Sequence, residues 1–139
     1  MGLRREGREA AVQFLFAHDL QAGKLSDVEQ EAFWEIHSAK RGARGFAEQL
    51  IKGVLSRLTE IDERIVAATQ NFSIDRLGNV DRNILRLAIY EFIAVPDVPP
   101  PVVINEAIEI AKKFASAESA SFVNGVLDRI SRDLKTSAP

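Results

Sequence analysis

Apolar residues recur every three or four positions along almost the whole chain, and the alternation of apolar and polar residues typical of strands is rare. This spacing predicts about seven helices. They span approximately residues 4–21, 26–36, 43–58, 59–68, 79–93, 101–114 and 116–134. We expect one all-α domain over residues 1–139, built from two packed helical bundles, at about 1–75 and 76–135, that share the helix at 79–93.

The helix at 79–93 is predicted to be the central one, because its apolar residues cover nearly its whole circumference. Arg86 lies within this apolar segment. A buried charge is costly unless an opposite charge lies beside it. We therefore expect an acidic neighbour for Arg86, with Asp62 and Glu106 as candidates.

Composition narrows the class of protein. The chain has 139 residues, of which 46% are hydrophobic, and no cysteine, so disulfides and thiolate metal sites are excluded. No apolar stretch has the length of a signal peptide or a membrane span. We expect a cytoplasmic protein with no membrane contact.

The sequence offers no constellation typical of catalysis. His18 and His37 have no partner at metal-ligand spacing, and the glycines at 42–45 follow no strand and lack the ending of a phosphate-binding loop. Paired carboxylates such as Glu106 and Glu109 are ordinary on helix surfaces. We predict no enzymatic activity, no metal and no cofactor.

A nucleic-acid site, if present, must be local, because the net charge is −2. Arg4, Arg5 and Arg8 form a small basic cluster at the start of the first helix. At about 100° per residue, Phe16 lies roughly opposite the core residue Phe14 and on the side of Arg5 and Arg8.

Arginines beside an exposed aromatic ring suit single-stranded RNA, because guanidinium groups contact phosphates and the ring stacks on an unpaired base. Alternatively, Phe16 and Val12 pack against another helix. The helical pattern alone favours this alternative.

The last helix repeats the pattern more weakly. Phe122 lies at the edge of the apolar stripe, beside Glu118 and Arg129. Gly125 is a glycine in the interior of a helix, which costs close to ~1 kcal/mol relative to alanine. We therefore expect another element to approach the helix closely at Gly125, with helix packing as the simplest cause.

Several motifs, in matching order and with matching gaps, resemble the NusB family of transcription antitermination factors. The resemblance covers essentially the whole chain. It is carried by Arg8-Glu9-Ala10-Ala11-Val12-Gln13-Phe14-Leu15-Phe16, by Asp81-Arg82-Asn83-Ile84-Leu85-Arg86-Leu87-Ala88-Ile89-Tyr90-Glu91, by Pro99 and Val103-Ile104-Asn105-Glu106-Ala107, by Ala111-Lys112-Lys113-Phe114, and by Ser119 and Phe122-Val123-Asn124-Gly125-Val126-Leu127-Asp128.

The resemblance implies a protein without enzymatic activity that binds the boxA element of ribosomal-RNA leader transcripts. Its partners would be NusE, a ribosomal protein of the small subunit, and the transcription elongation complex, and some members of the family form homodimers. Asp81 and Arg82 would face the ribosomal partner. The implied RNA-binding residues are Arg4, Arg5, Arg8, Phe16, Glu118, Ser121 and Phe122.

A related module precedes the catalytic domain of certain ribosomal-RNA methyltransferases, but the chain ends at Pro139, so we expect the free-standing factor. The alternative function is a docking module of an rRNA-modifying system. Two departures weaken the predicted RNA affinity. Ser121 stands where some relatives carry a basic residue, and the arginine cluster is short, so fewer phosphate contacts are expected.

Overall fold

A computed structural model describes residues 2–21, 25–37, 41–69 and 77–137, which form seven helices and no strand. This confirms the all-α prediction, and the helix bounds lie within a few residues of those expected. The helices are α1 (Leu3–Leu20), α2 (Asp27–His37), α3 (Arg41–Ser56), α4 (Leu58–Thr69), α5 (Asn79–Ala94), α6 (Pro100–Phe114) and α7 (Ala117–Ser137).

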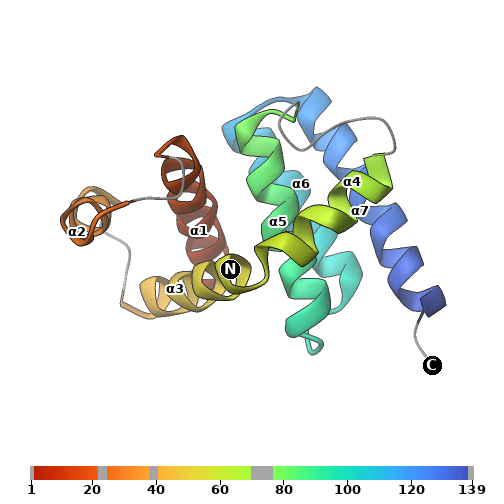
Figure 1. The fold of residues 1–139 in the computed structure, drawn as a ribbon, viewed down its shortest axis with the longest axis horizontal. Coiled ribbons are helices and arrows are strands. Elements are labelled where there is room, and N and C mark those ends of the chain that lie inside the picture. Colours follow the sequence, from red (N-terminus) through yellow and green to blue (C-terminus); the bar gives the residue numbers. More distant parts are fainter. Residues whose placement is uncertain (1, 22–24, 38–40, 70–76, 138–139) are drawn as a thin grey trace.

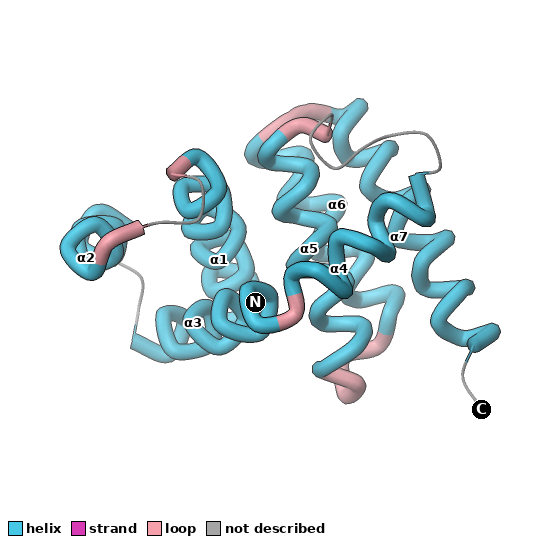
Figure 2. Tube along the Cα trace, in the orientation of Figure 1, coloured by secondary structure: helices cyan, strands magenta, loops and turns pink. Residues whose placement is uncertain are grey.

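The helices form two groups that meet at α5. Figure 1 shows α1, α2 and α3 on one side of α5, with α6 and α7 on the other. The same arrangement is clear from the helical tube of Figure 2. Helix α4 packs against α5 and α7, so packing groups it with the C-terminal helices, whereas the sequence placed it in the first bundle. Its apolar stripe marks a buried face but does not identify the helix that covers it.

Helix α5 is central, as predicted. Arg86 is 7% exposed and donates to Asp62 from Nε at 2.8 Å and from Nη2 at 2.9 Å, so the expected acidic neighbour is confirmed. Asp19 of α1 is a second partner, at 3.2 Å from Nη1. The other candidate, Glu106, pairs with Arg5 instead.

Two helix starts carry the caps that their sequences favour. The Ser26 hydroxyl accepts the Glu29 N–H at 3.1 Å, while the Glu29 carboxylate accepts the Ser26 N–H at 3.1 Å. Ser116 accepts the Ser119 N–H at 3.0 Å at the start of α7. Asn79, in contrast, does not cap α5: its side chain accepts a hydrogen bond from Asn83 at 2.7 Å within the helix.

Three glycines differ in what surrounds them. A Cβ at Gly7 would meet Phe46 of α3 at 2.7 Å, and one at Gly53 would collide with the ring of Tyr90, so α1 and α5 approach α3 closely there. Gly125 is exposed, and a Cβ there would meet nothing within 4 Å. The expectation of close helix packing at Gly125 is therefore wrong for the described residues.

Candidate nucleic-acid interface

An apolar groove of about 450 Å³ lies between the two groups of helices, beside Phe16. Phe16 is half-buried, whereas Phe14 is only 4% exposed and packs edge-on against Phe33 at 5.2 Å. The two rings of α1 therefore have the different environments that the helical projection predicted. The groove is lined by Val12, Gln13, Phe16 and Ala17 of α1, Phe33 of α2, Val80 of α5 and Phe114 of α6.

Arg8 is not on the exposed surface, contrary to the sequence-based expectation of a cationic face. It is 4% exposed, and its guanidinium donates to Glu91 of α5 from Nε at 3.0 Å and from Nη2 at 2.7 Å. Glu91 is 2% exposed. Helical phase gives the direction in which Arg8 points, but it could not show that Glu91 of α5 lies in that direction.

Arg5 and Arg4 remain accessible. Arg5 donates to both carboxylate oxygens of Glu106 in α6, at 3.0 and 2.5 Å, and keeps 38% of its side chain exposed. The hydrogen bond from Arg5 holds the pKa of Glu106 below its usual value, although partial burial opposes this. Arg4 is exposed and lies 5.7 Å from the centre of the Phe46 ring.

One cation lies over a ring of the groove wall and was not among the residues expected from the sequence. Lys113 lies 5.5 Å from the centre of the Phe114 ring and 2.9 Å from Glu9, and it is 59% exposed. Arg5 is eleven residues before Phe16 on α1, which corresponds to roughly 16 Å of helix. The adjacent pair Lys112 and Lys113, directly before the aromatic Phe114, was the signal in the sequence that could have identified this region.

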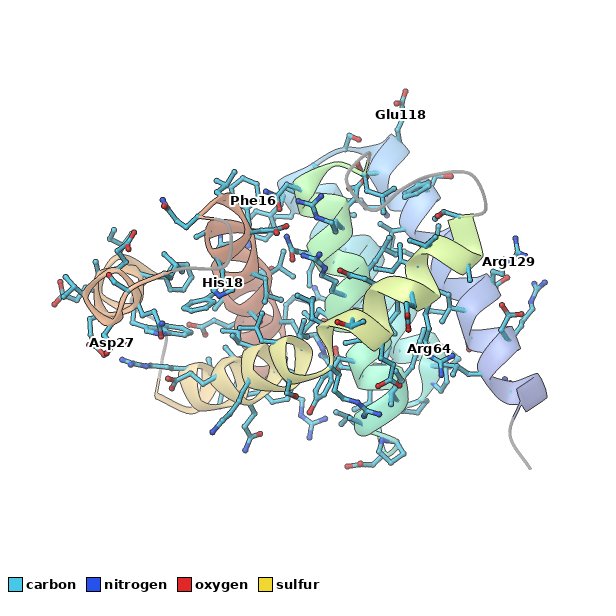
Figure 3. The ribbon with its side chains drawn as sticks, in the orientation of Figure 1. Phe16, His18, Asp27, Arg64, Glu118 and Arg129 are labelled. Atoms are coloured by element: carbon cyan, nitrogen blue, oxygen red, sulfur yellow. The ribbon has the colours of Figure 1, made fainter. Side chains whose placement is uncertain are left out.

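The start of α7 lies against the start of α5. The Ser119 hydroxyl donates to Asp81 at 3.2 Å, and Asp81 directly follows Val80, a residue of the groove wall. Figure 3 shows Glu118 projecting outward at the same end of the molecule as Phe16. Ser121 is also exposed, whereas Phe122 is half-buried and packs against the core.

Arg82, the second expected partner-binding residue, belongs to an internal network. It donates to Asp19 from Nη2 at 2.6 Å, and Asn83 donates to the same oxygen at 3.2 Å. Burial raises the pKa of Asp19, but the hydrogen bonds from Arg82 and Asn83 and the charge of Arg86 outweigh it, so this pKa lies below its usual value. The network joins α1 to α4 and α5.

Neither a metal site nor a membrane-spanning helix occurs among the described residues. No group of three or more histidine, aspartate or glutamate side chains is arranged to hold a metal ion there. None of the helices in those ranges combines the length and the apolar character needed to cross a membrane.

Comparison with known proteins identifies the family. The profile of the NusB family matches residues 5–132. The chain belongs to the NusB family.

The relatives agree with this assignment. The transcription antitermination protein NusB of Geobacter sulfurreducens is 44% identical over 134 residues, which cover 96% of this chain and 97% of that protein. The T. maritima NusB structure has a TM-score of 0.82 and 38% identity, with 94% and 91% of the two chains covered. A structure of the antitermination factors NusB and NusE in complex with dsRNA has a TM-score of 0.85 and 32% identity, with 96% and 98% covered.

Within this NusB-family fold, the expected RNA-binding residues divide by position. Phe16 lies in the groove wall, whereas Glu118 and Ser121 are exposed residues at the start of α7, outside the groove lining. Arg4 and Arg5 lie at the other end of α1. The ion pair of the half-buried Glu9 and the exposed Lys113 lies between them and joins α1 to α6.

Proposed function

We propose that this chain is a transcription antitermination factor that binds boxA-type single-stranded leader RNA together with the ribosomal protein NusE, and so supports ribosomal-RNA transcription in the cytoplasm. The observation that carries the RNA-binding part is the apolar groove with Phe16 and Phe114 in its walls. Family membership and the NusB–NusE complex among the structural neighbours support the rest.

The groove favours an unpaired base as its occupant. Its walls are almost entirely apolar, and a base in a single strand is free to insert and stack on an aromatic ring. Stacking of this kind contributes about 1–3 kcal/mol per base. Lys113 stands beside Phe114, where its charge would neutralise a phosphate next to the inserted base.

Arg4 and Arg5 are proposed to hold the RNA backbone further along α1, because both remain accessible. Arg8 is proposed as a positioning residue: by holding Glu91 it fixes α1 against α5, and it does not itself reach the solvent. Glu118, Ser121 and Phe122 would border the RNA at the start of α7.

The start of α5 is proposed as the surface for NusE, with Asp81 as the accessible residue and Arg82 as its support. Asp81 is half-buried and bonded only to Ser119 among the contacts described, whereas Arg82 is held by Asp19. This chain and NusE together would then join the transcription elongation complex. A homodimer that covers the groove would compete with RNA for the same surface.

The test is fluorescence anisotropy with a labelled leader-RNA fragment that contains boxA, with and without NusE, over a range of salt concentrations. Phe16→Ala should weaken binding by about fivefold or more, the equivalent of losing one stacked base. Leu20→Ala is the matched control, because Leu20 is an exposed apolar residue of the same helix outside the groove.

Arg5→Ala should weaken binding and flatten its salt dependence, because a phosphate contact that releases a counterion is lost. A duplex of the same sequence should bind more weakly than the single strand. Unchanged affinity in folded Phe16→Ala would remove the groove from the proposal. Binding of NusE without any contribution to RNA affinity would favour the docking-module alternative.

A further inference from the structure

Helix α2 has two different faces, and the aromatic residues of its inner face are buried against the neighbouring helices. Phe33 and Trp34 are 8% and 7% exposed, and their ring centres lie 5.0 Å apart in an edge-on arrangement. Phe33 also packs against Phe14, and the Arg44 guanidinium lies 5.0 Å from the centre of the Trp34 ring. These contacts account for how α2 is held against α1 and α3.

The outer face carries an apolar stripe that no described residue covers. Val28 is 79% exposed and Ile36 is 77% exposed, the highest values among the large hydrophobic residues described, and Ala32 between them is also exposed. At about 100° per residue, these three side chains lie within roughly 80° of one another, on the side away from Phe33 and Trp34. A single exposed apolar residue is ordinary, but a stripe at spacings of four residues is typical of helices that pack on a second helix.

Carboxylates border this stripe on both edges. Residues Asp27–His37 contain four acidic side chains and neither lysine nor arginine, although the whole chain has a net charge of only −2. Glu31 and Glu35 lie on one edge and Glu29 on the other. The single ion pair described for Glu31, to Arg44 at 3.7 Å, is an exposed one and contributes little.

We propose that the outer face of α2, defined by Val28, Ala32 and Ile36 with their flanking carboxylates, is a docking surface for a basic amphipathic helix of a protein partner. The apolar stripe would pack against the partner's apolar side, and the carboxylates would pair with flanking lysines or arginines, as in helix pairs bordered by opposite charges.

The negative charge of the outer face of α2 argues against RNA, anionic lipid surfaces and a second copy of this chain as its occupant. RNA and anionic lipid surfaces carry negative charge and would be repelled by the carboxylates. A second copy of this chain would bring the same acidic face against itself, because a two-fold dimer contact pairs identical surfaces.

The experiment uses the full chain and a labelled helical peptide of about 18 residues, built from leucine and lysine in an amphipathic pattern. A peptide with glutamate in place of lysine is the control for charge. Trp34 is the only tryptophan, and it lies on the inner face of α2, so its fluorescence reports whether α2 remains packed in each variant.

The lysine peptide should bind, with NMR shift changes confined to α2, and Val28→Ser/Ile36→Ser should weaken binding at least tenfold. Val66→Ser/Val102→Ser is the matched control, since Val66 and Val102 are exposed valines of α4 and α6, and it should not change the affinity. Glu31→Gln should weaken binding and reduce its salt dependence.

Three results would overturn the proposal. They are equal binding to Val28→Ser/Ile36→Ser, shift changes that map outside α2, and sedimentation showing a dimer of the chain that the same double variant dissociates. The last result would make a second copy the occupant.

Discussion

The pair of Arg8 and Glu91 should be among the most sensitive to substitution in the molecule. Arg8 and Glu91 are 4% and 2% exposed, and three hydrogen bonds of 2.7–3.2 Å join them. Removal of one partner leaves the other charge buried without compensation, which costs about 3–5 kcal/mol. Because a domain of this kind is stable by only about 5–15 kcal/mol, Arg8→Met should remove a large part of the stability.

The measurement is urea unfolding at neutral pH, followed by circular dichroism and by Trp34 fluorescence. Arg4→Met is the matched control, because Arg4 is exposed on the same helix, and it should change the free energy of unfolding by no more than about 0.5 kcal/mol. The double variant Arg8→Met/Glu91→Leu should be more stable than the sum of the single effects predicts, with a coupling energy of about 1–3 kcal/mol.

The same variants separate a structural role of Arg8 from a direct contact with RNA. If Arg8 acts only by holding α1 against α5, the double variant should recover much of the RNA affinity that Arg8→Met loses. The reasoning fails if Arg8→Met unfolds with the same midpoint as the wild type. It also fails if the folded double variant has lost RNA binding as completely as the single variant.

Three further predictions concern pH, packing and RNA affinity. The pKa values of Asp19 and Glu106 lie below those of the same groups in the unfolded chain, so the folded state binds fewer protons. The urea midpoint should therefore fall as the pH is lowered through about 4. Asp19→Asn should reduce the dependence of this midpoint on pH. Gly53→Ala should destabilise the protein by about 1–3 kcal/mol, because the added Cβ collides with Tyr90. Gly125→Ala should stabilise it by up to about 1 kcal/mol, because the added Cβ meets open space in a helix. Thermal unfolding of the two variants measures both effects. Glu106→Gln should raise RNA affinity in the anisotropy assay, because it frees Arg5 from its carboxylate partner, and should do so more than the control Glu109→Gln.

Local patterns in the sequence were sufficient for the helices and for one buried contact. The spacing of apolar residues predicted every helix, because each helix buries its own stripe regardless of which neighbour covers it. The partner of Arg86 could be foreseen for a similar reason. A charge on an apolar helix needs an opposite charge, and Asp62 was an acidic residue on the preceding helix.

The environment of Arg8 could not be foreseen in this way. Its partner Glu91 is 83 residues away, and helical periodicity gives the direction of a side chain but not the helix that lies in that direction. The groove is a similar case, since four helices contribute to it and Phe114 belongs to the apolar stripe of α6 in the sequence. Gly125 shows the opposite error: an apparent requirement for close packing turned out to face open space.

The two arginine contacts of α1 show why burial, more than charge, should decide which residues can bind RNA. Arg5 and Arg8 each hold a carboxylate with a two-pronged guanidinium contact, and the partners lie on the adjacent helices α6 and α5. Arg5 keeps over a third of its side chain in solvent, so a phosphate can compete with Glu106 for it at little cost in packing. Arg8 has no such access, and releasing it from Glu91 would leave both charges buried without a partner at the contact of α1 with α5, next to the groove whose wall α1 forms.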